Sequence, residues 1–310
     1  MQRIINHIIF LIAVALLVAG CDKQKSDPDN ITTGVLSIHK FNDSIPANTS
    51  AELRAFLKTI GAPDFASWSQ TSAARVFTPD ADSVFKSRNP GQVIASVITN
   101  ARHERLRVPA KKFATVVWSK RQSIIFTDSV MLIALNHYLG PDYPGYAGMP
   151  EYIRRQKSPE MLPYDIAEAM VATAYPYDGN NATVLNRLLY EGALAEAKMR
   201  LVKDASPAVA LGYDDDTFKQ IEQNEHDLWQ KILEKKLLFD HDPTTAARLV
   251  APSPVTGILG TRVPGRVGRY VGWRIIRTYL ERNPDTTLSD ILSSNFYMSD
   301  DILRKAGYRP

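Results

Sequence analysis

The stretch NATVLNRLLYEGALAEAKMRLVK, residues 181–203, organises the predicted fold. Small or apolar side chains recur along it at intervals of three and four, at Leu185, Leu188, Gly192, Ala195, Met199 and Val202. This spacing predicts a long amphipathic helix with one buried face. Glu191 lies on that face. A carboxylate there needs a cation, a metal or a hydrogen-bond network, because burying it unpaired costs several kcal/mol.

A second carboxylate occupies a similar position in the helix predicted over Asp216–Lys236. Its inward side chains also step by three and four, at Phe218, Ile221, Leu228 and Ile232, and Glu225 fills the gap between them. Two carboxylates on facing apolar surfaces repel each other unless a cation or a shared proton joins them. The predicted helix Gly265–Glu281 offers four cations for this purpose, Arg266, Arg269, Arg274 and Arg277. We expect a buried ion pair between Glu191 or Glu225 and one of these arginines, with Glu225 or an arginine such as Arg274 close to Glu191.

The remaining patterns predict a mainly α fold (α+β), a helical body with a small sheet or β-hairpin. The predicted strands are Val35–Ile38 and a hairpin formed by Phe113–Trp118 and Ser123–Thr127. The predicted helices are Leu53–Ile60, Asp80–Lys86, Gly91–Arg105, Val130–Tyr138, Tyr164–Tyr175, Leu288–Ser293 and Ser299–Lys305, besides the three above. Gly268 and Gly272 lie four residues apart on a helix, which indicates close approach to another helix or to backbone.

The start of the chain predicts export and lipidation. Arg3 precedes an apolar run that is too short to span a membrane, so residues 1–20 are predicted to be a signal peptide. The run ends in Leu17-Val18-Ala19-Gly20-Cys21, which resembles a bacterial lipobox. In such lipoproteins the cysteine carries several acyl chains, palmitate among them, which hold the protein at a membrane. Residues 21–33 are then a lipidated flexible tether, and residues 34–310 form a single domain.

Composition narrows the possible functions. The formal net charge is +4 at pH 7, and the charges are mixed in sign along the chain, so no nucleic-acid-binding stripe is present. Cys21 is the sole cysteine, which excludes an internal disulfide.

Motifs for catalysis or metal binding are missing from the sequence. No zinc-binding pair of histidines at helical spacing occurs, and there is no Gly-x-Ser-x-Gly elbow. We therefore expect no metal, cofactor or catalytic residue.

Two alternative functions stay open. One is a metal-dependent hydrolase with an atypical carboxylate site that uses His226 or His241. The other is a ligand-binding lipoprotein with a groove or lid at Tyr138, Tyr143 and Tyr146 in the rigid loop that follows His137.

Several segments together resemble the gliding-motility lipoprotein GldB family of Bacteroidota. They are the lipobox, HYLGPDYPGY at 137–146, NEHDLW at 224–229, PGRVGRYVGWRII at 264–276 and AGYRP at 306–310. The resemblance implies a membrane-anchored protein of the cell envelope, outside the cytoplasm, in a family linked to gliding and secretion. Envelope proteins are then its expected partners, at the cell membrane or the outer membrane.

A more distant resemblance concerns Glu191. The segment LYEGALAE at 189–196 is similar to the helix that supplies a third, glutamate ligand in zincin-type metallopeptidases. In those enzymes a His-Glu-x-x-His helix lies upstream, and the matching residues here are Ala167, Glu168 and Val171. Both histidine positions are apolar, so two of three zinc ligands are missing. We expect a pseudoenzyme on a zincin-like scaffold, with Glu168, Glu191, Glu225 and Arg274 as a buried polar site.

Overall fold

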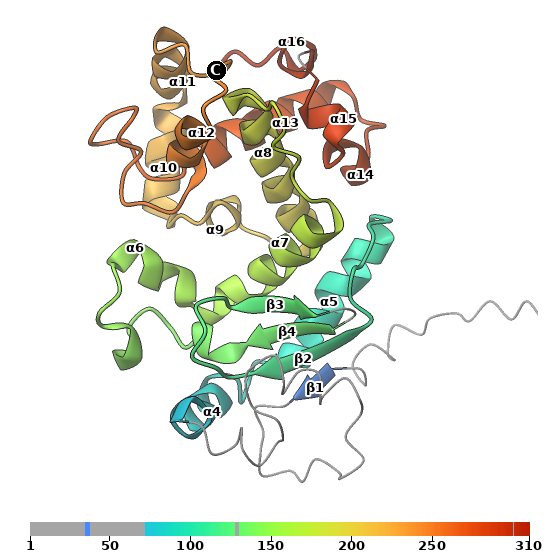
Figure 1. Ribbon diagram of the computed structural model, residues 1–310, viewed down its shortest axis with the longest axis vertical. Helices are drawn as coiled ribbons and strands as arrows, with labels where there is room; N and C mark the ends of the chain where they lie inside the picture. The colour runs from blue at the N-terminus through green and yellow to red at the C-terminus, as the bar shows by residue number, and fades with distance from the viewer. Residues whose placement is uncertain (1–34, 38–71, 128–129, 300) are drawn as a thin grey trace, which may run out of the picture.

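The computed structural model describes residues 35–37, 72–127, 130–299 and 301–310 (Figure 1). The predicted signal peptide, Cys21, the tether and the helix Leu53–Ile60 lie outside these residues. In the described part the fold is mainly α with a small sheet, as predicted. Figure 1 shows the sheet toward one end of the molecule and helices α8 and α10 to α16 toward the other, with α7 between them.

The helices have the following bounds. They are α4 (Ser72–Val84), α5 (Pro90–His103), α6 (Glu151–Arg154), α7 (Leu162–Ala174), α8 (Val184–Leu201), α9 (Pro207–Leu211), α10 (Asp215–Gln223), α11 (Glu225–Glu234), α12 (Pro243–Val250), α13 (Val267–Arg282), α14 (Leu288–Ile291), α15 (Ser294–Tyr297) and α16 (Ile302–Ala306). Among these residues, no helix is both long enough and apolar enough to cross a membrane.

The sheet has four strands in the order β1-β2-β4-β3. The strands are β1 (Val35–Ser37), β2 (Lys112–Val116), β3 (Ile124–Thr127) and β4 (Val130–Ala134). β2 pairs in parallel with both β1 and β4, whereas β3 pairs antiparallel with β4. The predicted strand at Val35 is confirmed. The predicted hairpin between Phe113–Trp118 and Ser123–Thr127 is wrong, because these two strands do not pair with each other.

The helix predicted over Val130–Tyr138 is also wrong. Its first half is strand β4, and Leu135–His137 is a short 3₁₀ helix. Met131, Leu132, Ile133 and Ala134 are all fully buried, so both faces of the strand are covered. A continuous apolar run of this kind has no period of two, and periodicity alone does not distinguish such a buried strand from a buried helix.

Helix α8 is buried on nearly every side and not along one face. Within Val184–Leu201, only Arg187, Met199 and Arg200 are not buried. The helices α5, α7, α9, α12 and α13 pack around it. Small residues permit this packing: a Cβ added to Gly192 would lie 2.6 Å from the backbone nitrogen of Trp273 on α13. The predicted close approach at Gly268 and Gly272 is confirmed, since Cβ atoms there would collide with Leu249 and Leu188.

The helix predicted over Asp216–Lys236 is two helices. α10 ends at Gln223 and α11 begins at Glu225, with Asn224 between them. The side-chain amide of Asn224 donates to the Gln220 carbonyl at 2.7 Å, which satisfies a carbonyl at the end of α10. Asp214, and not Asp216, caps α10 by accepting from the Thr217 amide at 2.7 Å.

Candidate functional site

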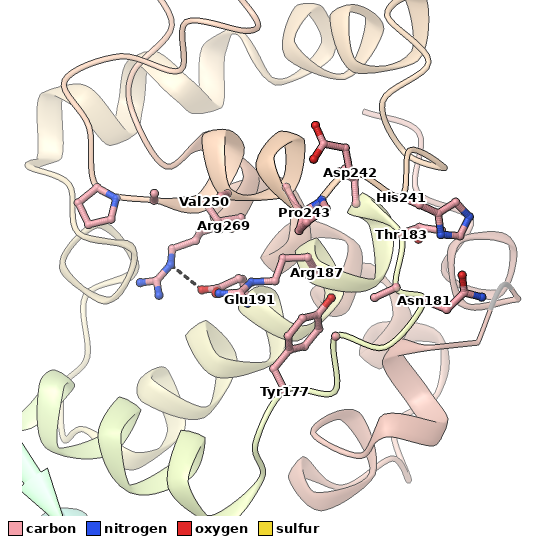
Figure 2. Close-up of a pocket in the computed structure, with 17 residues that line it drawn as sticks. Tyr177, Asn181, Thr183, Arg187, Glu191, His241, Asp242, Pro243, Val250 and Arg269 are labelled. Carbon is pink, nitrogen blue, oxygen red and sulfur yellow. Dashed lines mark hydrogen bonds and ion pairs between the residues drawn. The ribbon is translucent and has the colours of Figure 1, made fainter.

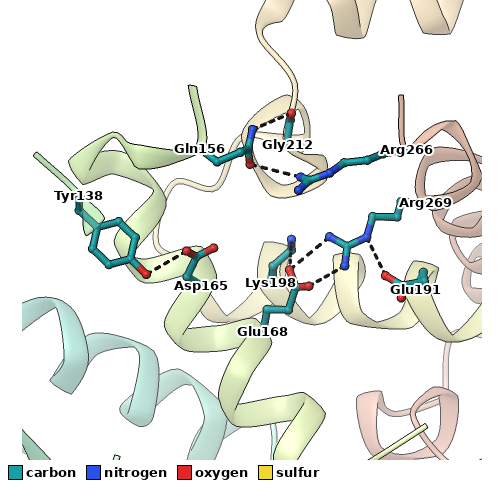
Figure 3. A network of polar contacts seen from close by, with 9 residues as sticks. All are labelled: Tyr138, Gln156, Asp165, Glu168, Glu191, Lys198, Gly212, Arg266 and Arg269. Atoms are coloured by element: carbon teal, nitrogen blue, oxygen red, sulfur yellow. Dashed lines mark hydrogen bonds and ion pairs between the residues drawn. The ribbon is translucent and has the colours of Figure 1, made fainter. Parts of the chain in front are cut away.

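Glu168 on α7 and Glu191 on α8 are brought together by one arginine of α13 (Figure 3). Nη2 of Arg269 lies 2.6 Å from Oε1 of Glu168, and its Nε lies 2.7 Å from Oε2 of Glu191. The Glu191 side chain is only 3% exposed. The guanidinium therefore bridges two carboxylates from two different helices in the interior.

Two further cations complete this cluster, which we call the Arg269 network. Nζ of Lys198 donates to Oε2 of Glu168 at 2.6 Å, and the Lys198 side chain is only 5% exposed. Nη2 of Arg187 donates to Oε1 of Glu191 at 2.6 Å. Figure 2 shows Glu191 between Arg269 and Arg187. Each carboxylate thus contacts two cations, which offsets the cost of burying the charges.

The charges in the network stabilise one another. Burial alone would raise the pKa of Glu168, but Arg269 and Lys198 hold that pKa well below its usual value. Burial opposes the charge on Arg269, yet Glu168 and Glu191 raise the pKa of this guanidinium. The charged forms of Glu168 and Arg269 therefore favour each other.

Two cavities adjoin the network, and a third lies next to one of them. The Glu191 cavity, about 480 Å³, is lined by Tyr177, Arg187, Glu191, His241 and Arg269 among others. The Asp165 cavity, about 500 Å³, is lined by Asp165, Glu168, Lys198, Arg266 and Arg269 among others. The Asp214 cavity, about 820 Å³, is lined by Gln156, Gly212, Tyr213, Asp214 and Arg266 among others.

The three cavities are neighbours, because they have lining residues in common. Arg269 and Pro252 line both the Glu191 cavity and the Asp165 cavity. Gln156, Gly212 and Arg266 line both the Asp165 cavity and the Asp214 cavity. The buried ion pairs of Arg269 therefore lie beside a row of three neighbouring cavities, which we call the cleft, with the Asp165 cavity in the middle.

Comparison with known proteins identifies the family. The family model described as "Gliding motility protein GldB" matches residues 35–310, from strand β1 to the last residue. This chain belongs to the GldB family. Family membership makes it a gliding-motility-associated lipoprotein with a membrane-associated place in the cell envelope. Neither the curated proteins nor the solved structures include a match.

The four residues predicted as one buried polar site fall into two clusters in this GldB-family protein. Glu168 and Glu191 belong to the Arg269 network. Glu225 instead accepts from Nε of Arg274 at 2.8 Å, from the Tyr270 hydroxyl at 2.8 Å and from the Tyr308 hydroxyl at 2.7 Å. An arginine lies close to Glu191, as expected, but it is Arg269 and not Arg274. An arginine of the predicted helix pairs with each glutamate.

The Glu225 cluster holds the C-terminus of the chain. Tyr308 also stacks edge-on against Trp229, and the carbonyl of Pro310 lies 2.8 Å from Nδ1 of His226. Two of the segments that resemble the GldB family, NEHDLW and AGYRP, therefore contact each other. Their contacts are structural, since they fasten the chain end to α11.

The tyrosines predicted as a groove or lid fasten their own loop. The Tyr143 hydroxyl donates to Asp80 at 2.6 Å, and the Tyr146 hydroxyl donates to the Asn136 carbonyl at 2.6 Å. Neither side chain lines any of the three cavities. Tyr138 alone reaches the site, because its hydroxyl donates to Oδ2 of Asp165 at 2.9 Å.

Arg187, Lys198 and Asp165 belong to the site and were not predicted. Lys198 lies two helical turns after Glu191, and Asp165 lies one turn before Glu168, so helical spacing contained the signal for both. Arg266 was considered only as a partner for Glu191 or Glu225. It contacts neither of them, and its Nη1 donates to Oε1 of Gln156 at 3.2 Å.

The histidines of the hydrolase alternative lie apart. His226 is exposed and faces Pro310, whereas His241 lines the Glu191 cavity. Within the part of the chain that the structure describes, no three His, Cys, Asp or Glu side chains gather in a metal-binding arrangement.

Proposed function

We propose that this protein acts without catalysis, as an envelope lipoprotein anchored through Cys21 that binds a protein partner in the cleft along the Arg269 network. The observation that carries the proposal is the position of the Arg269 guanidinium between Glu168 and Glu191, 2.6 and 2.7 Å from their oxygens. A guanidinium supplies, from within the chain, the positive charge that two buried carboxylates require.

The resemblance to zincin-type peptidases suggests why this arginine bridge matters: it joins the two glutamates that correspond to those of the peptidase metal site. Glu168 and Glu191 match the two glutamates of the peptidase pattern, and Ala167 and Val171 stand where the zinc-binding histidines would be. Ala167 and Val171 are 0% and 1% exposed, packed in the apolar core. An arginine between the surviving glutamates supports a pseudoenzyme, because a metal ion could enter only by displacing that arginine and leaving it unpaired.

The shape of the cleft supports a polypeptide as the bound molecule. Three cavities share walls in series, and they offer charged, hydrogen-bonding and apolar groups along their length. An extended segment of a partner protein fits such a surface, since its backbone and alternate side chains need contacts at regular intervals.

Metal content and peptidase activity test the absence of catalysis. The full-length protein, purified in detergent and dialysed against excess zinc, should retain less than one tenth of an equivalent of metal and leave unstructured peptides intact. Glu191→Gln should change neither result. Glu225→Gln is the matched control, because Glu225 is also a largely buried glutamate, 12% exposed, that is paired with an arginine. Stoichiometric zinc that is lost in Glu191→Gln and kept in Glu225→Gln would overturn the proposal.

Site-specific crosslinking tests the protein contact. A photoreactive amino acid at Ala251, which is exposed and lines the Glu191 cavity, should capture an envelope protein in the host cells. The same group at Lys86, exposed just beyond α4 near the sheet, should capture none (Figure 1). Equal capture from both positions, or capture from Lys86 only, would contradict binding in the cleft.

A further inference from the structure

The Asp165 cavity contains one cation without a carboxylate in contact. Of the three cations in its wall, Lys198 and Arg269 each contact Glu168. Arg266 contacts an amide instead, with Nη1 3.2 Å from Oε1 of Gln156. No carboxylate among the described residues lies within ion-pairing distance of Arg266. A half-buried guanidinium with four donors left over is an anion-binding group.

The surroundings of Arg266 hold it in this position. The Gln156 side chain accepts from Arg266 and donates to the carbonyl of Gly212 at 3.0 Å. Gly212 has a φ of +84°, and a Cβ at this position would overlap the guanidinium. The absence of a side chain at Gly212 therefore lets Arg266 lie directly against the backbone.

The electrostatics agree with the geometry. Burial and then the nearby Arg269 lower the pKa of Arg266, whereas the carboxylates in contact with Arg269 raise the pKa of that residue. Glu168 and Asp165 oppose this lowering of the Arg266 pKa from a distance, but neither carboxylate contacts Arg266. An added negative group would gain a charge-assisted, bidentate contact in a partly desolvated place.

Asp165 restricts which anion fits. Its carboxylate lines the same cavity, and Figure 3 shows it across from Arg266, on the side of Lys198 and Glu168. Tyr138 satisfies one oxygen of Asp165, so the other is available to accept a hydrogen bond. A ligand must therefore present a negative group to Arg266 and an N–H donor to Asp165. A peptide carboxylate with its neighbouring backbone amides has both. Inorganic phosphate has no N–H group, and its larger negative charge near pH 7 is repelled more strongly by Asp165 than the single charge of a carboxylate.

We propose that the Asp165 cavity binds the carboxylate of a peptide segment, with Arg266 as its ion-pair partner and Asp165 as the acceptor for a backbone N–H. This inference rests on the proposed function, because it names the group by which a partner protein enters the cleft. The carboxylate belongs either to an acidic side chain or to the C-terminus of the partner.

Three short peptides distinguish these sources. The probes are N-acetylated tetra-alanine with a free C-terminal carboxylate, the same peptide with an amidated C-terminus, and an amidated peptide with one alanine replaced by glutamate. Each is titrated by NMR into the full-length protein in detergent. The amidated tetra-alanine should bind at least about tenfold more weakly than one or both of the carboxylate peptides. The carboxylate peptide that binds more tightly shows whether the site takes a C-terminal carboxylate or an acidic side chain.

Two variants and one control test Arg266 itself. Arg266→Gln should lower the affinity for the carboxylate peptide to the affinity for the amidated peptide. Gln156→Glu leaves Arg266 in place and puts a competing carboxylate beside it, so it should have the same effect even if Arg266→Gln does not fold. Arg262→Gln, an exposed arginine in the same loop, should leave the affinity unchanged.

The outcomes separate this inference from the proposed function. Unchanged carboxylate affinity in Gln156→Glu, equal binding of the amide, or competition by inorganic phosphate at equal concentration would overturn the carboxylate site. Peptides that stay intact but do not bind would overturn only this site. Cleavage of a bound peptide would overturn the non-catalytic function and leave the carboxylate contact standing.

Discussion

Gly192 on α8 and Gly272 on α13 meet at the crossing of the two helices, with no side chain between them. A Cβ on Gly272 would lie 2.6 Å from the carbonyl carbon of Leu188, closer than real Cβ atoms approach backbone. Glu191 is next to Gly192, and Arg269 lies one turn before Gly272. The crossing therefore places the arginine against the carboxylate, so packing and the polar site depend on the same contact.

Replacing Gly272 with alanine should destabilise the fold strongly. The added methyl group must push α13 away from α8, which costs about 3 kcal/mol or more and loosens the Arg269 network. Chemical denaturation of the full-length protein in detergent measures the change. Gly257→Ala is the matched control, since a Cβ there meets nothing within 4 Å, and it should change the free energy of unfolding by less than about 0.5 kcal/mol. Equal midpoints for both variants would show that the helices are not in close contact.

Glu191→Gln should lower the free energy of unfolding by about 2–4 kcal/mol. The change removes the charge that Arg187 and Arg269 share, and it leaves two partly buried guanidinium groups less compensated. Glu151→Gln is the comparison, because Glu151 is 66% exposed in its pair with Arg155, and a surface pair contributes only about 0–1 kcal/mol. A loss no larger than that of Glu151→Gln would contradict a buried network.

Asp165 should make the stability depend on pH. Burial, and then the charge of Glu168, raise the pKa of its carboxyl from 3.8 to about 6. Between these values the folded protein keeps a proton that the unfolded chain has lost. The Asp165 contribution therefore destabilises the fold as the pH rises through about 6.

Asp165→Asn removes this contribution. Relative to the natural protein, the variant should gain about 1–3 kcal/mol as the pH rises from about 4 to about 7. His137 acts in the opposite direction, because burial and then Lys157 lower its pKa to about 4. Both proteins contain His137, so its effect cancels in the difference. A difference that stays constant with pH would show that the carboxyl of Asp165 is not perturbed.

Cys21→Ala should abolish lipidation. Without the thiol no acyl chain attaches at the end of the signal sequence, so the variant should leave the detergent phase on partitioning and show no acyl mass by mass spectrometry. Its melting midpoint should match that of the lipidated protein, since the predicted tether separates Cys21 from the predicted domain. Recovery of a variant that still carries acyl chains would refute the lipobox assignment.

Local patterns predicted much of the helical body. The steps of three and four residues located α5, α7, α8 and α13 to within a few positions, and they placed Glu191 and Glu225 on buried faces. They also predicted that an arginine of α13 pairs with Glu191 or Glu225, and in the structure each of the two glutamates has such a partner. These features follow from the chain alone, because helical periodicity and the cost of a buried charge are local properties.

Tertiary packing decided the rest. Strand β4 escaped prediction because a segment covered on both faces has no period, and the pairing order of the sheet depends on residues far apart in the chain. Spacing placed Arg266, Arg269 and Arg274 on one helix but could not say which would meet Glu191. The crossing of α8 and α13 at their glycines decides this pairing, because it places Arg269 against Glu168 and Glu191. Arg274 then pairs with Glu225, and Arg266 lines the Asp165 cavity without contacting a carboxylate.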